Sequence, residues 1–525
     1  MQLQGQQVLI LGLGASGLAM ARWCAHAGAQ VTVADTRESP PQLAALQTEW
    51  PAVRFVPGPL LANLVEGTSM RAVFRSPGLS PEVVAPVVDA AKAMGLWQGG
   101  ELSLFTAGLQ DLKTRFGYSP QVLAITGTNG KTTVTSLTGQ LVARAGQSVK
   151  MAGNIGPTLL DTLAQAMLEA EFQVKLQGEQ SPSEPETPMA QALPQVWVLE
   201  LSSFQLDSSE GFEPTAATVL NVSQDHLDWH GSMAAYSAAK ARIFGEQALM
   251  VLNRDDAQVM HMLPSPIKVK LQKPMARACV TFGGDMPQRP GDFGIEVTHG
   301  MTWLVRALEA DETRRRRKDE AEELHFQRLI PADALRIRGR HNAVNALAAL
   351  ALASSAGCAL GPMLYGLREY RGEPHRVEPV AIINGVEFFD DSKGTNVGAT
   401  VAALQGLGQE RRVVVILGGE GKGQDFRPLT DPVTRFTRGV VLMGRDAPSI
   451  RKVLEATGVQ IADAKDMADA VAQAASMATS GDAVLMSPAC ASFDMFDHYG
   501  HRAEVFCQAV ASLAEAAGVA MEGGL

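Results

Sequence analysis

The stretch GTNGKTT, Gly127 to Thr133, directly follows the apolar run Val122 to Ile125. A buried strand that ends in a glycine-rich loop and then enters a helix is typical of P-loop proteins, whose loop N–H groups surround phosphate oxygens. Lys131 can reach the terminal phosphates, and the hydroxyl of Thr132 can bind Mg²⁺. The usual P-loop has a further glycine where this chain has Ile125, which indicates a subgroup and not a generic NTPase. We therefore predict an ATP site here.

A second glycine loop, GLGASG at Gly12 to Gly17, follows the apolar run Val8 to Leu11 and precedes a helical pattern and a second strand. This is the dinucleotide-binding arrangement, in which a helix amino terminus faces an anion. It could hold NAD or another diphosphate, or the glycines could serve only close packing of helix on strand. Asp35, Thr36 and Arg37 at the end of the second strand offer an acceptor, a hydroxyl and a cation that a uracil or ribose could use.

Short runs rich in Val, Ile and Leu alternate along the chain with alanine-rich helical patterns, which favours an α/β fold with helices on both faces of parallel sheets. The runs cover residues 7–14, 29–36, 121–127, 195–203, 218–224, 411–419 and 482–489. With 525 residues, the chain is long enough for about three domains.

Composition narrows the class of protein. The 45 basic and 55 acidic residues give a net charge of -10, which offers no overall attraction for nucleic acid or an anionic membrane. Five scattered cysteines without a CxxC pair fit a reducing compartment, and no basic leader precedes the first strand, so we expect a cytoplasmic protein. The most apolar long stretch, from Ala343, is interrupted by polar residues, which favours a buried helix over membrane insertion.

Two polar stretches break the α/β pattern. Residues 177–195, within a wider region near 173–195, are rich in Pro, Glu, Ser and Gln, and predict a mobile surface insertion. Residues 309–324 concentrate opposite charges. A basic nucleic-acid patch is one interpretation, but the flanking acids largely cancel Arg314 to Lys318, so we favour a solvated loop or helix face.

Three further residues could carry chemistry. Glu200 ends one predicted strand and His226 follows another, so both belong at the edge where the P-loop opens and where a carboxylate and an imidazole could hold Mg²⁺. Alone, each could be an ordinary surface acid or loop histidine. Lys240 lies in an alanine-rich helix, where it is either a surface lysine or an amine whose pKa is lowered by burial.

Taken in order along the chain, these motifs resemble those of the Mur ligase family. The resemblance is carried by GTNGKTT at 127, GNIG at 153, ELSSFQL at 200, NVSQDHLD at 221, GRHNAVNALAA at 339, PHR at 374, DDSKGTN at 390, LGGEGKG at 417 and SPACASFD at 487. Within the family, ELSSFQL, SPACASFD and the DTR after the first glycine loop resemble the member that adds D-glutamate.

The resemblance implies three domains and a hinge. They are a Rossmann-like UDP-substrate domain at residues 1–111, a central P-loop-type ATPase domain at 112–372, and a carboxyl-terminal Rossmann-like domain at 373–525. A hinge near residues 370–376 would let the third domain close on the second.

The resemblance also implies the reaction. An ATP-dependent ligase would join D-glutamate to UDP-N-acetylmuramoyl-L-alanine through an acyl phosphate and a tetrahedral intermediate, giving ADP and phosphate, in cytoplasmic peptidoglycan precursor synthesis for the cell wall. The protein would act as a monomer, with ATP and Mg²⁺ as cofactors. Another Mur-type amino-acid ligase, an NAD-linked oxidoreductase and a noncatalytic ATP switch are the alternatives.

The family's functional positions match residues throughout this chain. The UDP substrate would meet Gly14, Ala15, Ser16, Gly17, Asp35, Thr36, Arg37, Ser76 and Asn154. ATP would meet Gly127, Thr128, Asn129, Gly130, Lys131, Thr132, Thr133, Asn342, Arg376 and Asp391. D-Glutamate would meet Thr395, Lys422, Ser492, Phe493 and Tyr499. The implied catalytic residues are Lys131, Glu200, His226, Lys240 and Lys393. The implied Mg²⁺ ligands are Thr132, Glu200, His226 and Lys240, the last as a carbamate, because carbon dioxide turns an ammonium that repels Mg²⁺ into an anionic oxygen ligand.

Overall fold

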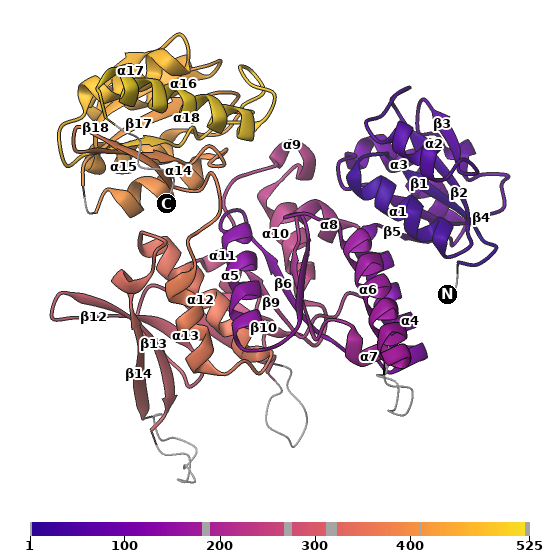
Figure 1. Cartoon of the computed structure of the whole chain (residues 1–525). Coiled ribbons are helices and arrows are strands. Elements are labelled where there is room, and N and C mark those ends of the chain that lie inside the picture. The colour runs from indigo at the N-terminus through magenta and orange to yellow at the C-terminus, as the bar shows by residue number, and fades with distance from the viewer. Residues whose placement is uncertain (1–2, 181–188, 267–275, 311–322, 410, 520–525) are drawn as a thin grey trace.

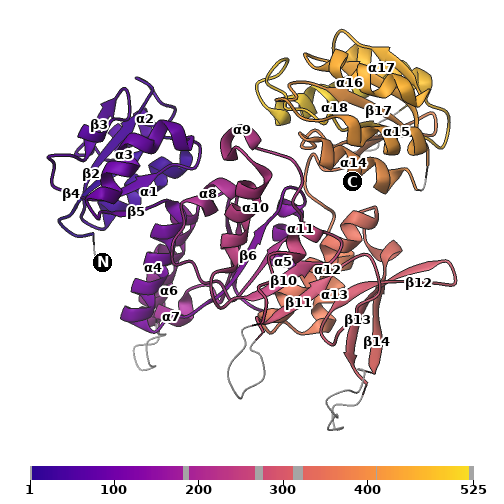
Figure 2. The same ribbon diagram turned by 180° about the vertical axis from the view of Figure 1, so that it is seen from behind.

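A computed structural model describes residues 3–180, 189–266, 276–310, 323–409 and 411–519. The chain forms three α/β units in sequence order, each with its own sheet (Figure 1). The amino-terminal and carboxyl-terminal units lie above opposite sides of the central unit, and α9 (Leu227–His230) lies between them in both views (Figures 1 and 2). The three-unit α/β architecture expected from the sequence is confirmed.

The amino-terminal unit is built on a five-stranded parallel sheet with the strand order β3-β2-β1-β4-β5. Its strands are β1 (Gln7–Leu11), β2 (Gln30–Asp35), β3 (Arg54–Pro57), β4 (Met70–Arg75) and β5 (Trp97–Gly99). Its helices are α1 (Ala15–His26), α2 (Leu43–Glu49) and α3 (Pro81–Ala93). The order reverses at β1, and the loop of residues 12–17 leaves the carboxyl end of that strand. This is the position at which open α/β sheets bind ligands.

The central unit has a six-stranded parallel sheet with the order β11-β10-β9-β6-β8-β7. Its strands are β6 (Gln121–Thr126), β7 (Val149–Gly153), β8 (Val196–Glu200), β9 (Ala216–Val219), β10 (Leu249–Asn253) and β11 (Cys279–Phe282). One face packs against α4 (Glu101–Phe116) and α6 (Leu159–Gln180). The other packs against α5 (Lys131–Arg144), α12 (Arg340–Ser355) and α13 (Leu360–Glu369). The smaller helices are α7 (Met189–Ala192), α8 (Ser203–Asp207), α10 (Met233–Ala241) and α11 (Ala257–Met260).

An antiparallel sheet of three strands, which the sequence pattern did not predict, extends the central unit. It consists of β12 (Phe293–Thr298), β13 (Met301–Glu309) and β14 (Leu324–Pro331). The charged stretch predicted as a solvated loop or helix face follows β13, and its residues 311–322 lie outside the described part of the chain. The predicted insertion at 177–195 begins as the last turn of α6 and ends in α7, while residues 181–188 also lie outside the described part.

The carboxyl-terminal unit has a six-stranded sheet with the order β15-β16-β20-β17-β18-β19, in which only β15 runs antiparallel to its neighbour. The strands are β15 (Glu378–Ile383), β16 (Val386–Asp390), β17 (Val413–Gly418), β18 (Thr437–Met443), β19 (Gln460–Asp463) and β20 (Ala483–Met486). The helices are α14 (Val397–Leu407), α15 (Thr430–Phe436), α16 (Ala447–Leu454), α17 (Met467–Met477) and α18 (Tyr499–Ala516).

The hydrophobic cores join the units unequally. One core cluster contains Val8 and Ile10 of the amino-terminal sheet together with Leu159 and Trp197 of the central unit. The two core clusters of the carboxyl-terminal sheet contain residues from that unit alone. The predicted boundary at residue 111 lies within α4, so the limits 1–111, 112–372 and 373–525 stay predictions.

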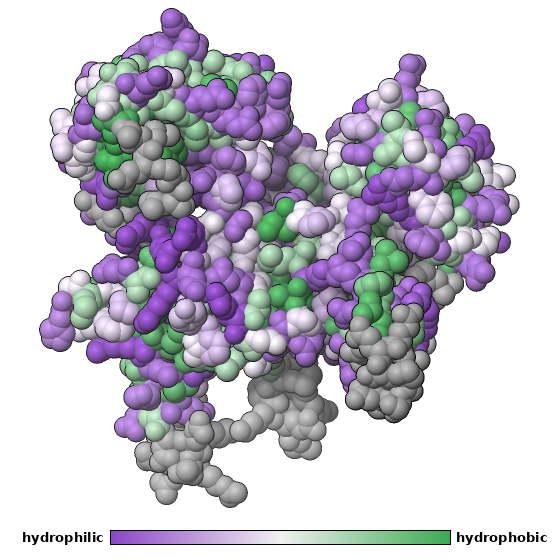
Figure 3. All heavy atoms as spheres, viewed as in Figure 1, coloured by the Kyte–Doolittle hydropathy of each residue, from purple (hydrophilic) through white to green (hydrophobic). Residues whose placement is uncertain are grey.

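Hydrophilic residues cover most of the face seen in Figure 3, and a hydrophobic patch lies over α6, where Leu168 and Phe172 are exposed. Among the described residues, no helix has both the length and the apolar character needed to cross a bilayer. The apolar stretch from Ala343 forms most of the buried helix α12, as expected.

A buried hydrogen-bonded pair in the central unit gives a first test of this packing. The Tyr118 hydroxyl donates to the carbonyl of Pro194 at 2.5 Å and accepts from Nε1 of Trp197 at 2.8 Å. Tyr118→Phe should leave both partners buried and unsatisfied, at a cost of roughly 1–3 kcal/mol for each group. We expect differential scanning calorimetry to show a Tm lowered by about 2 °C or more. Tyr365→Phe, at a side chain that is 56% exposed, is the control and should leave Tm unchanged; equal Tm values for both variants would contradict the prediction.

Candidate active site

The loop between β6 and α5 has the geometry of a phosphate cradle. Gly127 and Gly130 have φ values of +155° and +83°, a region that side chains with a Cβ rarely adopt. Asn129 N–H donates to the side-chain oxygen of Asn221 at 2.8 Å, and the Asn221 amide donates back to the Asn129 carbonyl at 3.0 Å. The loop is thereby tied to the segment after β9, and α5 starts at Lys131 with its amino terminus toward the loop.

Two lysines converge on one carbonyl of this loop. Nζ of Lys131 donates to the carbonyls of Gly127 at 2.9 Å and Thr128 at 2.8 Å. Nζ of Lys240 donates to the same Gly127 carbonyl at 2.9 Å and lies 4.5 Å from the ring centre of Tyr236. Lys240 is only 1% exposed, which rules out the surface-lysine interpretation. Burial, followed by repulsion from Lys131, lowers the pKa of Lys240 well below its ordinary value.

Glu200 ends β8 beside this pair and is 1% exposed. Its Oε1 accepts from the side-chain amide of Asn154 at 2.8 Å, while its Oε2 is buried with no hydrogen-bond partner among the described residues. Burial lowers the pKa of Lys131, and the nearby Glu200 opposes that shift. A buried carboxylate oxygen with no donor is costly unless a cation or a proton satisfies it.

His226 lies at the amino terminus of α9 with a φ of 53°, in the left-handed region. Burial lowers its pKa, and the adjacent Asp225 opposes that shift, so the ring is neutral near pH 7 and can offer a lone pair. The ring packs edge-on to Phe204 at 4.7 Å between centroids. His230, the next histidine, bonds to Ser203 at 2.9 Å and faces the same aromatic ring.

A cavity of about 470 Å³ opens between the central and carboxyl-terminal units. Sequence-predicted residues from both units line it: Thr128, Asn129, Lys131, Thr132, Asn154, Glu200, His226, Arg376, Lys393, Thr395, Lys422 and Tyr499. Lys240 lies behind the loop and not on the cavity wall. Four cations, Lys131, Arg376, Lys393 and Lys422, therefore face one space. Burial and Arg376 both lower the pKa of Lys393.

Three hydrogen bonds between described residues join the units across this cavity, one of them from the Asn396 amide to Asp225 at 3.4 Å. Nη2 of Arg376 donates to the hydroxyl of Thr132 at 2.9 Å. The side-chain amide of Asn396 donates to Asn129 at 3.1 Å, and its oxygen also caps α14 by accepting from Ala399 N–H at 2.9 Å. Residues in the phosphate loop thus contact two segments of the third unit directly.

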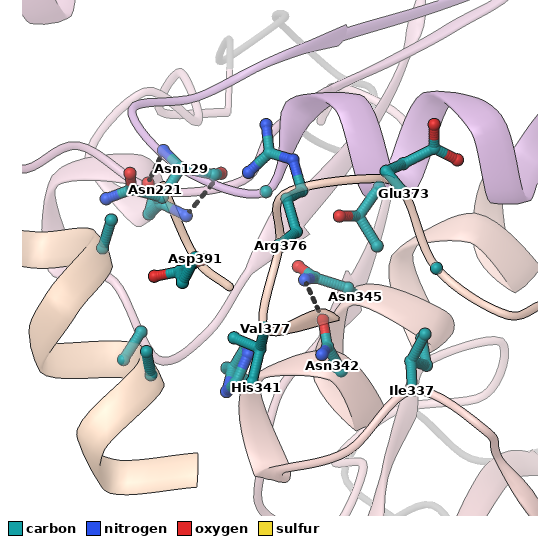
Figure 4. A pocket seen from close by; sticks show the side chains of 16 residues that line it. Asn129, Asn221, Ile337, His341, Asn342, Asn345, Glu373, Arg376, Val377 and Asp391 are labelled. Atoms are coloured by element: carbon teal, nitrogen blue, oxygen red, sulfur yellow. Dashed lines mark hydrogen bonds between the residues drawn. The ribbon is translucent and has the colours of Figure 1, made fainter. Parts of the chain in front are cut away.

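A smaller cavity of about 120 Å³ adjoins the first and shares Asn129 and Arg376 with it. In Figure 4, Asn342 and Asn345 of α12 lie opposite Asp391, with Arg376 on the chain segment between them. Asn345 donates to Asn342 at 3.2 Å. The structure therefore brings together the three residues predicted for the nucleoside and phosphates, Asn342, Arg376 and Asp391, although they come from two units.

The first glycine loop lies apart, in the amino-terminal unit. The Asp35 carboxylate is fully buried and accepts from Leu13 N–H at 2.7 Å and from the Arg37 guanidinium at 2.8 Å, bonds that hold its pKa at about 2 despite burial. Asp35 therefore shapes the loop, while Thr36 and Arg37 are the exposed members of this group. Ser76 is nearly buried after β4, where its N–H donates to the carbonyl of Leu11 at 2.8 Å.

The predicted D-glutamate residues are less well gathered. Thr395, Lys422 and Tyr499 line the large cavity, but Ser492 is buried at 2% exposure and Phe493 is 63% exposed, and neither lines it. Lys422 has a φ of 49°, and its ammonium lies 5.6 Å from the ring centre of Phe493. Only three of the five predicted residues, Thr395, Lys422 and Tyr499, thus face the cavity described here.

Some site residues were missed from the sequence. Asn221 and Asp225 lie in the quoted motif after β9, Asn345 lies one turn beyond Asn342, and Asn396 ends DDSKGTN. Asp225, Asn345 and Asn396 stand within three residues of one that was selected, and Asn221 begins the motif that contains His226, so polar positions inside the same motifs were the available signal.

Known proteins match the whole chain. Family models match in order: the Mur ligase MurD-like N-terminal domain at residues 6–97, the Mur ligase middle domain at 125–353, and the Mur ligase glutamate ligase domain at 375–490. A UDP-N-acetylmuramoylalanine--D-glutamate ligase from Albidiferax ferrireducens is 67% identical over 521 residues, 99% of either chain. One from Polaromonas sp. is 56% identical and covers 99% of this chain and 100% of its own. The crystal structure of a UDP-N-acetylmuramate-alanine ligase from Thermotoga maritima shares the fold, with a TM-score of 0.52, 18% identity, and coverage of 97% of this chain and 99% of its own.

Asp391 gives a test of the site's electrostatics. Burial raises its pKa from 3.8 to about 7, which the Ser487 hydroxyl and Arg376 oppose. The folded chain therefore binds more protons than the unfolded chain between these two values. Stability must fall as pH rises through this window, by at most roughly 1.4 kcal/mol per pH unit.

An amide does not titrate. In calorimetry on the free protein, we therefore expect the Tm of Asp391→Asn to fall less than that of the wild type as pH rises from about 4 to about 7. The control is Asp431→Asn, at a side chain that is 70% exposed, which should keep the wild-type pH dependence. Identical Tm slopes in the wild type and Asp391→Asn would show that Asp391 titrates normally.

Proposed function

Because the chain belongs to the Mur ligase family, we propose that it is the ATP-dependent ligase that joins D-glutamate to UDP-N-acetylmuramoyl-L-alanine in peptidoglycan precursor synthesis. The observation that carries the proposal is the identity of 67% over 99% of both chains with a D-glutamate ligase. The two glycine loops then have separate tasks. The first binds the UDP that marks the acid substrate, and the second holds the ATP that is consumed.

The chemistry requires activation of a carboxylate. An amine does not displace oxide from a carboxylate in water, so the γ-phosphoryl group of ATP is transferred to a carboxylate oxygen, and ADP leaves. The amine of D-glutamate then attacks the acyl carbon, a tetrahedral intermediate forms, and phosphate departs as the amide is made. Such reactions depend on positioning and on neutralising negative charge.

The cations around the large cavity supply that neutralisation. Lys131 is the first residue after the phosphate loop. Arg376 of the third unit donates to Thr132 in the first turn of α5. Lys393 faces the same cavity and would meet charge that develops on the transferred phosphoryl group. Asn154, bonded to Glu200, would orient the substrate carboxylate toward ATP.

The residues present also fit Mg²⁺. The unpartnered Oε2 of Glu200 and the hydroxyl of Thr132 would hold one ion, and the neutral ring of His226 with Lys240 would hold a second. Bound there, Mg²⁺ would offset charge on the phosphates. Lys240 requires a change first, since an ammonium repels a cation. Its lowered pKa favours the free amine, which forms an N–C bond with carbon dioxide and releases one proton to give a carbamate.

The substrate contacts follow from the same assignment. The diphosphate would lie at Gly14 to Gly17, where α1 begins, with the uracil near Thr36 and Arg37. The carboxylates of D-glutamate would lie near Thr395 and Lys422 in the third unit. The monomeric state, the cytoplasmic location and the hinge at residues 370–376 stay predictions. The full-length match to ligases gives the alternatives of an NAD-linked oxidoreductase and an ATP switch no support.

The amino-acid specificity provides the direct test. Phosphate release is measured with UDP-N-acetylmuramoyl-L-alanine, ATP and Mg²⁺, with D-glutamate, L-glutamate, L-lysine or meso-diaminopimelate as the amine. We expect release and amide formation with D-glutamate alone. Strict dependence on another amino acid would overturn the assignment, and phosphate release without any amine would indicate an ATPase.

Lys240→Ala tests the second cation site. The variant should lose most of its activity, on the order of a hundredfold or more, because no carbamate can form at an alanine. Bicarbonate should restore little of it. Lys92→Ala, in the last turn of the amino-terminal helix α3, is the matched control and should retain full turnover. Full activity of Lys240→Ala would exclude a catalytic role for this amine.

A further inference from the structure

A buried carboxylate that the reaction scheme leaves unused lies where three helices begin. Glu101 is the first residue of α4 and is 2% exposed. Its Oε2 accepts from the hydroxyl of Ser16 in the first turn of α1 at 2.8 Å. Its Oε1 accepts from Leu160 N–H in the first turn of α6 at 3.1 Å. One side chain therefore bridges the glycine loop of the amino-terminal unit and the central unit.

The groups around Glu101 suit a carboxylate that accepts hydrogen bonds. Burial raises the pKa of Glu101, whereas the donors from Ser16, Leu160 and Leu159 act in the opposite direction, and Asp161 adds to the rise. The three helix amino termini also place positive partial charge around the carboxylate. A buried carboxylate without hydrogen-bond partners would be destabilising. The hydrogen bonds from Ser16 and Leu160 therefore make a glutamate tolerable at this position.

In the central unit, a short turn at residues 153–157, closed by hydrogen bonds, connects α6 to the groups proposed to react. Gly153 N–H donates to the carbonyl of Pro157, and Gly156 N–H donates to that of Gly153, both at 2.9 Å. Asn154 lies inside this turn and bonds to Glu200 twice, once through its N–H and once through its side chain, each at 2.8 Å. Because α6 begins directly after the turn, displacement of Leu160 displaces Asn154.

We propose that Glu101 is a positioning residue that holds the glycine loop of residues 12–17 in register with the turn of residues 153–157. The UDP end of the acid substrate is then placed at a fixed distance from the groups that meet its carboxylate. The inference rests on the proposed function, since that function assigns the loop to UDP and the turn to the reacting carboxylate. Glu101 itself touches neither substrate nor ATP.

Substitution at Glu101 separates positioning from general stability. Glu101→Ala removes both hydrogen bonds, and we expect the KM for UDP-N-acetylmuramoyl-L-alanine to rise roughly tenfold, with the KM for ATP unchanged within about twofold. Glu101→Gln restores the link, because its oxygen can accept from Leu160 and its amide can donate to the rotatable Ser16 hydroxyl. It should recover most of the wild-type KM. Glu82→Ala, at an exposed acid in the first turn of α3, is the control and should change neither constant.

A second readout does not depend on turnover. Hydrogen exchange at the Leu160 amide should accelerate in Glu101→Ala and remain protected in Glu101→Gln. If the alanine variant does not fold, Glu101→Asp replaces it, because a side chain shorter by one methylene cannot reach both donors, and the same split between the two KM values is expected.

The outcomes are distinct. Equal effects on both KM values, loss of turnover alone, or unchanged exchange at Leu160 would overturn the positioning role. A wild-type protein that forms no amide would instead refute the proposed function, and the exchange result would still decide whether Glu101 links the two units.

Discussion

The carbonyl of Gly127, which accepts from both Lys131 and Lys240, is the constraint on which the rest of the site depends. Two unit charges about 4 Å apart repel by about 4 kcal/mol at an effective dielectric constant of 20. This repulsion adds to burial in lowering the pKa of Lys240. Asp225 opposes the lowering of the Lys240 pKa, and Glu200 and Asp225 oppose that of Lys131, without cancelling either. A site with this excess of positive charge favours binding of a highly charged anion. It also favours loss of a proton from one lysine.

The sequence predicted the parallel sheets well because their strands are buried on both faces. Runs such as residues 413–418 are fully buried and read as continuous apolar segments between glycine loops. Strand β14 lacks such a continuous apolar run, since its exposed and half-buried residues alternate irregularly. The antiparallel sheet was therefore not predicted. Helix α6 extends to Gln180 through residues that composition alone assigned to an insertion, because a helix docked on a sheet tolerates polar residues at its far end.

The candidate site could be predicted where function is encoded in short motifs, and not where it depends on contacts between distant segments. Motifs placed Glu200 at the end of a strand, as in β8, and both Glu200 and His226 line the cavity beside the phosphate loop. The environment of Lys240 could not be predicted from the sequence of its helix. The rotation of the helix relative to the sheet decides whether the side chain faces solvent or the Gly127 carbonyl. Likewise, the bond from Asn396 to Asn129 joins residues 267 positions apart, and nothing local specifies it.

The two outer units are attached by different physical means, and this difference suits their tasks. The amino-terminal unit shares an apolar core with the central unit and adds the ion pair between Arg75 and Asp207 at 2.6 Å, so moving it would expose buried hydrophobic area. The carboxyl-terminal unit has its own cores and contacts the phosphate loop through side chains such as Arg376 and Asn396. Rotation of that unit would exchange these hydrogen bonds with water and separate α14 from α12, but it would not open a shared core cluster. This difference fits the proposal that the amino-terminal unit holds the UDP end in place while the carboxyl-terminal unit, proposed to bring the amino acid, moves.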